Sequence, residues 1–171
     1  FRSSLNDSNP VHIKQAEQDL QSLTPQVRGV VGDEITMMLQ QNEGHIAVVW
    51  SGVAAPLVQE GDTYDYVVPK EGSNVWFDNM VIPKTAQNKE GAYQFINFLL
   101  DAKNNKQNTE WVGYATPNKA ARNLLPNNIK NDHRFYPTQK EQKRLEVYKD
   151  LGEKTLGEYN ESFLNFKMSL K

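Results

Sequence analysis

The spacing of apolar positions changes several times along the chain, and these changes predict helices that alternate with strands. Asn9 followed by Pro10 is typical of a helix start, because an Asn side chain caps free backbone N–H groups and proline fits the first turn. The apolar residues that follow fall on one face of a helix, and Pro25 ends it. These residues are Ile13, Ala16, Leu20 and Leu23.

The next part of the chain indicates a second helix and several strands. Asp33 is expected to cap this helix and Gly44 to end it. Residues 45–50 form a nearly continuous apolar run, which is typical of a parallel strand covered on both faces. The pattern also predicts a strand or extended connector over 27–31, a short helix over 53–59, and strands over 64–69 and 74–82.

Helical spacing returns after Pro83. Asn88 is expected to cap a helix whose buried stripe contains Ala92, Phe95, Ile96 and Leu99. Further helices are predicted over 105–112, after Asn118 and over 139–170, where Gly152 bends or divides the last one. Helices in alternation with strands indicate the α/β fold class.

Composition narrows the possible functions. The 171 residues are enough for one domain with a core, and 38% are hydrophobic, although the mean hydropathy of -0.69 is polar. The net charge of -2 argues against a nucleic-acid surface, which normally needs a basic excess. The sequence contains no cysteine, which excludes disulfides, thiolate nucleophiles and zinc–thiolate sites. It begins with neither Met nor a signal peptide, so we expect it to start within a longer protein.

Aromatic and acidic residues provide the candidate chemistry. Trp50 ends a predicted strand, and ligands of open α/β sheets bind at the carboxyl ends of strands. Trp76 and Asp78 are expected on one face of a strand, where a ring and a carboxylate could grip an organic cation. Each also has a structural interpretation: Trp50 as a core residue, and Trp76 with Asp78 as a half-buried ring beside a surface acid. Tyr114, in a loop before Pro117, either packs on the core or lines a pocket.

Five short motifs occur in a fixed order over residues 44–137. They are Val-Val-Trp-Ser-Gly, Val-Val-Pro-Lys-Glu-Gly, Trp-x-Asp, Asn-Lys-Glu-Gly-Ala, and Gly-Tyr-x-Thr-Pro-Asn-x-Ala-Ala-Arg. In this order and spacing they resemble the C-terminal half of the spermidine/putrescine-binding proteins of bacterial ABC transporters. Those proteins are bilobed receptors that deliver polyamines to a membrane permease.

The resemblance implies a periplasmic-binding-protein-like (type II) bilobed fold, represented by its C-terminal half. Residues 1–73 would belong to the second lobe, 74–137 would complete the first lobe, and 138–171 would return as a helical segment to the second. A missing N-terminal half, or a swapped copy of the chain, would cover the first-lobe surfaces. The resemblance also implies a location in the periplasm, or anchoring by lipid on the outer face of the cytoplasmic membrane.

The resemblance also assigns ligand-binding roles. Trp50 and Trp76 would stack on the methylene chain of spermidine or putrescine, Asp78 would pair with an amine, and Tyr114 would form a third wall. Tyr148 stands where the family has a glutamine that bonds an amine, with Glu146 two residues away. No metal site, cofactor or catalytic residue is implied.

Other functions remain open at this point. His12, His45 and His133 are far apart in sequence and no Gly-x-Ser-x-Gly motif occurs, so the chain is not expected to be an enzyme, and Asp132-His133-Arg134 is expected to be a solvated loop. A receptor of the same fold for an amino acid or ferric iron is an alternative. Tyr64 and Tyr66 look structural rather than iron-binding, and Arg122 lies on a predicted surface helix. The effector-binding domain of a regulator is the third possibility.

Overall fold

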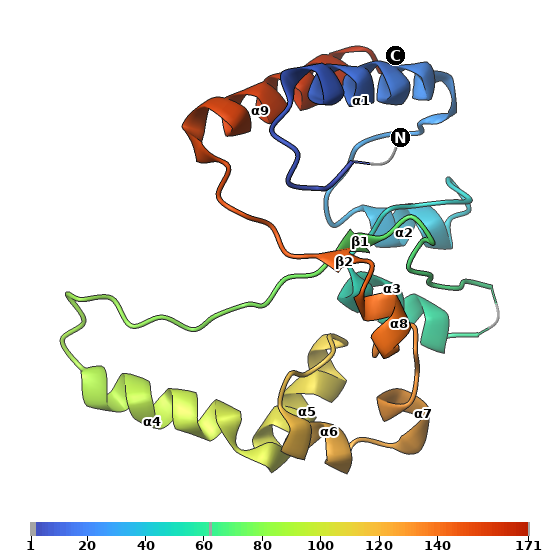
Figure 1. The fold of residues 1–171 in the computed structure, drawn as a ribbon. Helices are drawn as coiled ribbons and strands as arrows, with labels where there is room; N and C mark the ends of the chain where they lie inside the picture. Colours follow the sequence, from blue (N-terminus) through green and yellow to red (C-terminus); the bar gives the residue numbers. More distant parts are fainter. Residues whose placement is uncertain (1–2, 62, 171) are drawn as a thin grey trace. The chain divides into compact units, whose positions relative to one another are not determined.

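The computed structural model describes residues 3–61 and 63–170, and Figure 1 shows the order of their elements. Most of the regular structure is helical. The helices are α1 (Pro10–Ser22), the 3-10 turn η1 (Thr24–Gln26), α2 (Ile35–Gln40), α3 (Ser51–Gln59), α4 (Lys89–Leu100), α5 (Ala102–Val112), α6 (Lys119–Leu124), α7 (Asn127–Lys130), α8 (Gln139–Gln142) and α9 (Gly152–Met168). The strands are β1 (Ser73–Asn74) and β2 (Leu145–Glu146).

Side-chain caps set the starts of several helices. Asn9, Asn88 and Asn118 accept the backbone N–H groups of Val11, Gly91 and Ala121 at 3.0, 2.9 and 3.1 Å. The three predicted Asn caps are therefore confirmed. Helix α5 begins before the predicted residue 105, because Asp101 accepts the N–H groups of Lys103 and Asn104 at 3.0 and 3.2 Å.

Two further helix predictions were wrong in their bounds. Helix α2 has Glu34 rather than Asp33 at its N-cap, without a side-chain cap, and it ends at Gln40 rather than near Gly44. Asn42 adopts a left-handed φ of 58° just beyond the helix, a role that Asn can fill in place of glycine. The predicted helix over 139–170 is instead the short α8, strand β2 and α9, which begins at Gly152.

The strand predictions were mostly wrong for this chain. Strand β1 pairs with β2 in parallel, with Ser73 opposite Leu145, but the described residues of 45–50, 64–69 and 75–82 form no strand. Residues 27–31, predicted as a strand or an extended connector, form a connector. A strand exists only where a neighbouring strand pairs with its backbone. The run 45–50 has no such neighbour among residues 3–61 and 63–170, and Ile46 and Val48 lie open, 92% and 103% exposed.

The first compact unit contains the residues up to Val48, Pro69–Trp76, and those from Arg144 onward. Helices α1 and α9 lie side by side in it (Figure 1) and bury Ile13 and Phe166. The Tyr159 hydroxyl on α9 donates to the backbone carbonyl of Asp7 at 2.8 Å. The carboxylate of Glu17 is buried, and a hydrogen bond from Lys14 lowers its pKa.

The second unit contains Val49–Val68 and Phe77–Lys143. Its buried hydrophobic residues come from α3, from the end of α6 and from the segment after α7; they are Ala54, Ala55, Leu57, Val58, Ala121, Leu125 and Tyr136. Residues 49–68 belong to the same compact unit as residues 77–143, whereas the resemblance assigns 49–68 to the second lobe together with residues 1–48. The assignment of segments to lobes therefore stays a prediction.

Helix α4 buries none of its residues, contrary to the expected buried stripe. Its aromatic side chains lie open, with Tyr93, Phe95 and Phe98 between 57% and 60% exposed. Of the expected stripe, Ala92, Ile96 and Leu99 are half-buried and Phe95 is exposed, so the neighbouring helix α5 covers this face only in part. Within residues 3–61 and 63–170, no helix combines the length and the apolar character needed to cross a lipid bilayer.

Candidate functional site

The start of α3 places Trp50 at the edge of the second unit. Trp50 is the N-cap residue with an extended backbone (φ -67°, ψ 146°), and its carbonyl accepts the N–H groups of Val53 and Ala54 at 3.0 and 3.1 Å. The helix that follows is apolar and buried, which fixes its first turn in the unit. The Trp50 side chain itself is 54% exposed, so a large ring is held by a buried helix yet remains accessible.

Tyr114 packs directly against the first turn of this helix. Gly52 is buried, and a Cβ atom there would lie 2.2 Å from Cε2 of Tyr114. Only glycine permits this approach, because real Cβ atoms do not come so close to a ring. We call this contact the Gly52–Tyr114 junction. Tyr114 therefore packs on a residue that lies two positions after Trp50 in the chain.

Hydrogen bonds just before and just after Tyr114 fix the loop that carries it. Gly113 ends α5 in the left-handed conformation (φ 74°), and its N–H donates to the carbonyl of Thr109 at 3.1 Å. Two residues after Tyr114, the hydroxyl of Thr116 donates to Asn105 Oδ1 at 2.6 Å, and its backbone N–H donates to the Tyr136 hydroxyl at 3.2 Å. These contacts restrict the backbone of Tyr114, whose ring remains 37% exposed.

Trp76 and Asp78 are not placed by a strand. Trp76 is the last residue of its segment in the first unit, and Asp78 lies in the second. Both side chains are exposed, Trp76 at 36%. Asp78 makes no hydrogen bond or ion pair with another described residue, so its carboxylate is available to a ligand amine. Their predicted pairing as a ring-and-carboxylate unit stays a prediction.

Tyr148 lies in the first unit between β2 and α9, with 59% of its surface exposed. One side chain fixes the backbone on either side of it. Asn6 donates through Nδ2 to the carbonyl of Val147 at 3.1 Å and accepts the N–H of Lys149 at 2.8 Å. Glu146, the acid near Tyr148, accepts hydrogen bonds from Ser4 and Asn6. Sequence reasoning missed Asn6, and its Ser-x-Asn context is too common to have revealed it.

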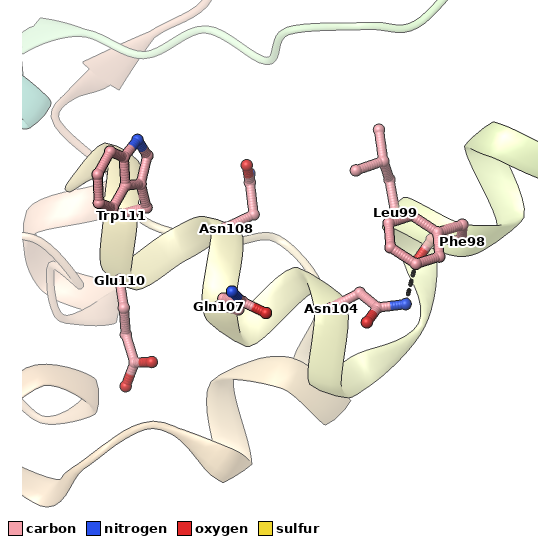
Figure 2. Close-up of a pocket in the computed structure, with 7 residues that line it drawn as sticks. All are labelled: Phe98, Leu99, Asn104, Gln107, Asn108, Glu110 and Trp111. Carbon is pink, nitrogen blue, oxygen red and sulfur yellow. Dashed lines mark hydrogen bonds between the residues drawn. The ribbon is translucent and has the colours of Figure 1, made fainter.

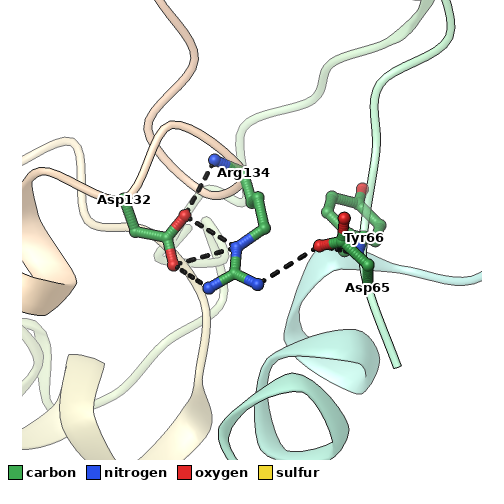
Figure 3. Close-up of polar contacts among 4 residues, drawn as sticks. All are labelled: Asp65, Tyr66, Asp132 and Arg134. Carbon is green, nitrogen blue, oxygen red and sulfur yellow. Dashed lines mark hydrogen bonds and ion pairs between the residues drawn. The ribbon is translucent and has the colours of Figure 1, made fainter. Parts of the chain in front are cut away.

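The predicted polar loop at Asp132-His133-Arg134 is confirmed, with His133 and Arg134 exposed, and it also carries two ion pairs (Figure 3). Arg134 lies between Asp132 and Asp65, with N–O distances of 2.7 and 3.2 Å. Arg122, the other cation considered for a ligand carboxylate, lies with its guanidinium 4.2 Å from the Tyr136 ring centre and donates to the Lys130 carbonyl at 2.8 Å. Both arginines are therefore engaged in contacts within the second unit.

A shallow hollow of about 500 Å³ lies outside this set of residues (Figure 2). It is lined by residues of α4 and α5, and none of the five predicted ligand-binding residues is among them: Phe98, Leu99, Asn104, Gln107, Asn108, Glu110 and Trp111 line it. Its one carboxylate, Glu110, pairs with Lys106 at 2.8 Å. A neutralised carboxylate does not favour a cationic ligand, so the hollow is a weaker candidate than the Gly52–Tyr114 junction. Among the described residues, no group of three or more His, Asp or Glu side chains could hold a metal ion.

The fold and these motifs define a class of protein. The family described as bacterial extracellular solute-binding protein matches residues 3–137, and the chain belongs to this family. A putative spermidine/putrescine ABC transporter from Listeria monocytogenes superposes with a TM-score of 0.89 at 53% identity, over 96% of this chain and 51% of that one. The spermidine/putrescine ABC transporter substrate-binding protein of Streptococcus pneumoniae gives 0.86 at 45% identity, over 98% and 52%.

Curated relatives include periplasmic polyamine-binding proteins. The spermidine/putrescine-binding periplasmic protein of Escherichia coli is 39% identical over 86% of this chain and 42% of its own length. The putrescine-binding periplasmic protein of Pseudomonas aeruginosa is 32% identical over 93% and 45%. The chain thus spans about half the length of the relatives it matches. The predicted family resemblance and fold class are confirmed, and the roles of the five predicted site residues stay predictions.

Proposed function

We propose that this chain forms part of the solute-binding subunit of an ABC importer and that its solute is a polyamine, spermidine or putrescine. The observation that carries the proposal is the agreement among relatives: those of 28–39% identity are named for binding spermidine or putrescine. The available side chains fit that ligand class. Exposed rings at Trp50 and Tyr114 suit a methylene chain, and the unpaired carboxylate of Asp78 suits an ammonium group.

The proposed mechanism is closure of two lobes around the extended polycation. Trp50, Trp76 and Tyr114 would cover its methylene groups, and Asp78 would accept charge-assisted hydrogen bonds from one amine. Tyr148 would occupy the place of the family's amine-binding glutamine, where a phenol accepts fewer hydrogen bonds from an amine than an amide oxygen accepts. This difference is expected to affect the preference between spermidine and putrescine.

The proposal extends to partners and location. Residues 1–73, 74–137 and 138–171 would contribute to the second lobe, the first lobe and the second lobe again. A first half like that of the longer relatives, or a swapped copy of this chain, would supply the remaining surfaces. The closed receptor would dock on a membrane permease, in the periplasm or anchored by lipid on the outer face of the membrane. We further propose that it catalyses no reaction, since its relatives are transport binding proteins.

A panel of solutes tests the ligand class. The longest form of the protein that contains these 171 residues would be heated with spermidine, putrescine, glutamate or ferric citrate in turn. A ligand that binds only the folded state at one hundred times its Kd adds about 2.7 kcal/mol of stability, so its midpoint rises by several degrees. A rise with the polyamines alone supports the proposal. A rise with glutamate or ferric citrate alone would instead identify a receptor for another solute.

A further inference from the structure

The loop that follows α5 carries Tyr114 between two points of restricted backbone. Gly113 ends the helix in the left-handed region, at φ 74°. Thr116 precedes Pro117, and a residue before proline is restricted to extended conformations. Tyr114 and one further residue lie between these two points. The direction in which the Tyr114 ring leaves the loop therefore depends on how Thr116 is held.

The side chain of Thr116 is bonded to α5. Its hydroxyl donates to Asn105 Oδ1 at 2.6 Å and accepts the backbone N–H of Asn118 at 3.0 Å. The direction of the first bond follows from the other half of the Asn105 amide, whose Nδ2 donates to the carbonyl of Leu99 at 3.1 Å. A hydroxyl has one hydrogen to donate, and here it goes to Asn105. An apolar side chain of the same shape at position 116 would therefore leave the amide oxygen without this bond.

The backbone of Thr116 is held from a second direction. Its N–H donates to the Tyr136 hydroxyl at 3.2 Å. Tyr136 is only 8% exposed, and the Arg122 guanidinium lies 4.2 Å from the centre of its ring. The hydroxyl is thus carried by a ring that is itself packed within the second unit. Two separate groups, an amide and a phenol, therefore fix Thr116 through its side chain and through its backbone.

The other end of the loop and the Tyr114 ring both lie against the start of α3. A Cβ atom at Gly52 would lie 2.2 Å from the ring. A Cβ atom at Gly113 would lie 3.3 Å from the Gly52 carbonyl oxygen and 3.5 Å from Cβ of Ala55. Packed surfaces of this kind have low compressibility and transmit small shifts. A displacement of Thr116 is therefore expected to change how the ring lies on α3.

We propose that Thr116 is a positioning residue of the ligand site, which keeps the Tyr114 ring in place on Gly52. It acts through the two residues of backbone that join it to Tyr114, with support from the Asn105 amide and the Tyr136 hydroxyl. The inference rests on the proposed function and deepens it, because Thr116 acts on the polyamine through Tyr114 and does not itself touch it. A ring that is already held in its binding position loses less freedom when ligand binds, so losing the Thr116 hydroxyl is expected to lower affinity.

The first experiment needs no ligand. A fluorotyrosine placed at position 114 of the longest form of the protein that contains this chain would report the ring environment by fluorine NMR. Thr116→Val removes the hydroxyl and keeps the shape of the side chain, and we expect it to shift or broaden the resonance. Thr116→Ser keeps the hydroxyl and should leave the resonance in place. If Thr116→Val does not fold, Tyr136→Phe, which removes the acceptor of the Thr116 N–H, takes its place with the same expectation.

The matched control is Thr24→Val. Thr24 also precedes a proline and is also half-buried, and its hydroxyl donates to the carbonyl of Gln21 at 3.0 Å in the first unit. The fluorine resonance should not respond to this change. A resonance that is unchanged in Thr116→Val, or that Thr24→Val changes equally, would overturn the proposal.

The second experiment is a double-mutant cycle on spermidine affinity. Thr116→Val is expected to weaken binding at least threefold in the wild-type background, as Thr116→Ser should not, and to have no further effect in the Tyr114→Ala background. A loss of the same size in both backgrounds would show that Thr116 acts independently of Tyr114 and would overturn the inference. If the wild-type protein binds no polyamine, the proposed function fails, while the fluorine resonance still decides whether Thr116 positions Tyr114.

Discussion

The two parts of the candidate site differ in how the chain holds them. At the Gly52–Tyr114 junction, the Tyr114 ring is positioned by a helix start and a hydrogen-bonded loop. It occupies the space that a Cβ atom at position 52 would take. Around Trp76 and Asp78, the backbone has no strand partner, and the two residues belong to different units. Contacts within the second unit therefore suffice to position Tyr114. The positions of Trp76 and Asp78 are not fixed by comparable contacts within one unit.

The same contrast separates α3 from α4. Both are apolar helices with well-defined starts, but α3 buries five of its residues and α4 buries none. Other residues of this chain bury α3, whereas the aromatic side chains of α4 remain exposed. Mutations at the packed junction should therefore change both stability and binding, whereas mutations at the open segments should change binding alone.

The largest effect is expected from filling the junction. Gly52→Ala places a methyl group where the Tyr114 ring now lies, so the ring must move. Overpacking of this kind costs about 1–3 kcal/mol of stability, and we also expect loss of polyamine affinity. The matched control is Gly157→Ala in α9, where nothing lies within 4 Å of the new Cβ atom. That change should raise the free energy of unfolding by about 0.5–1 kcal/mol. Equal unfolding midpoints for the two variants would contradict the account of the junction.

The carboxylate of the open segment should affect binding without affecting the fold. Asp78→Asn removes the negative charge proposed to hold an amine, and we expect at least a tenfold loss of affinity, about 1.4 kcal/mol. The unfolding midpoint should not change, since Asp78 has no partner among the described residues. Asp19→Asn on α1 is the control, because that side chain is bonded to Gln15 within its own helix. Unchanged affinity in Asp78→Asn would show that Asp78 is not an amine ligand.

A smaller effect is expected at Asn6, which fixes the backbone on both sides of Tyr148. Asn6→Ala removes three hydrogen bonds, to Glu146, Val147 and Lys149, each with a net value of about 0.5–1.5 kcal/mol. We expect a loss of affinity of about threefold, measured by titration calorimetry, if Tyr148 touches the ligand. Gln15→Ala on α1 provides a control that removes an amide bonded to Asp19 of its own helix. Equal affinities in the two variants would remove Tyr148 from the site.

The smallest effect concerns acid stability. Because Arg134 lowers the pKa of Asp132 in the folded protein, the pair stabilises the fold above the ordinary Asp pKa of 3.8. This contribution is lost as the pH falls through the lowered pKa. Asp132→Asn should therefore lower the unfolding midpoint slightly at pH 7 and have less effect near pH 2–3. An equal change at both pH values would contradict the ion pair.

Features encoded by neighbouring residues could be predicted from the sequence. The Asn9, Asn88 and Asn118 caps follow from a side chain that bonds to N–H groups two or three residues away. The strands could not be predicted in the same way, because pairing depends on segments distant in sequence. Leu145 and Tyr148 fit a helical spacing, yet Leu145 lies in β2 because Ser73 pairs with it.

The candidate site was predictable only in part. Trp50 and Tyr114 stood out as aromatic residues in recognisable motifs, but nothing in the sequence indicates that Tyr114 packs on Gly52, since the contact joins distant segments. The ion pair of Arg134 was missed for the same reason. Its local context, Asp132-His133-Arg134, correctly indicated a solvated loop, but its partner Asp65 lies far away in the chain.

The most direct test of polyamine recognition is calorimetric titration of spermidine and putrescine into the longest form of the protein that contains this chain. We predict a dissociation constant in the micromolar range or below for at least one of the two, with weaker binding in Asp78→Asn. No heat from either ligand, with protein shown to be folded and free of bound solute, would contradict the account and leave Trp76 and Asp78 without a role in binding.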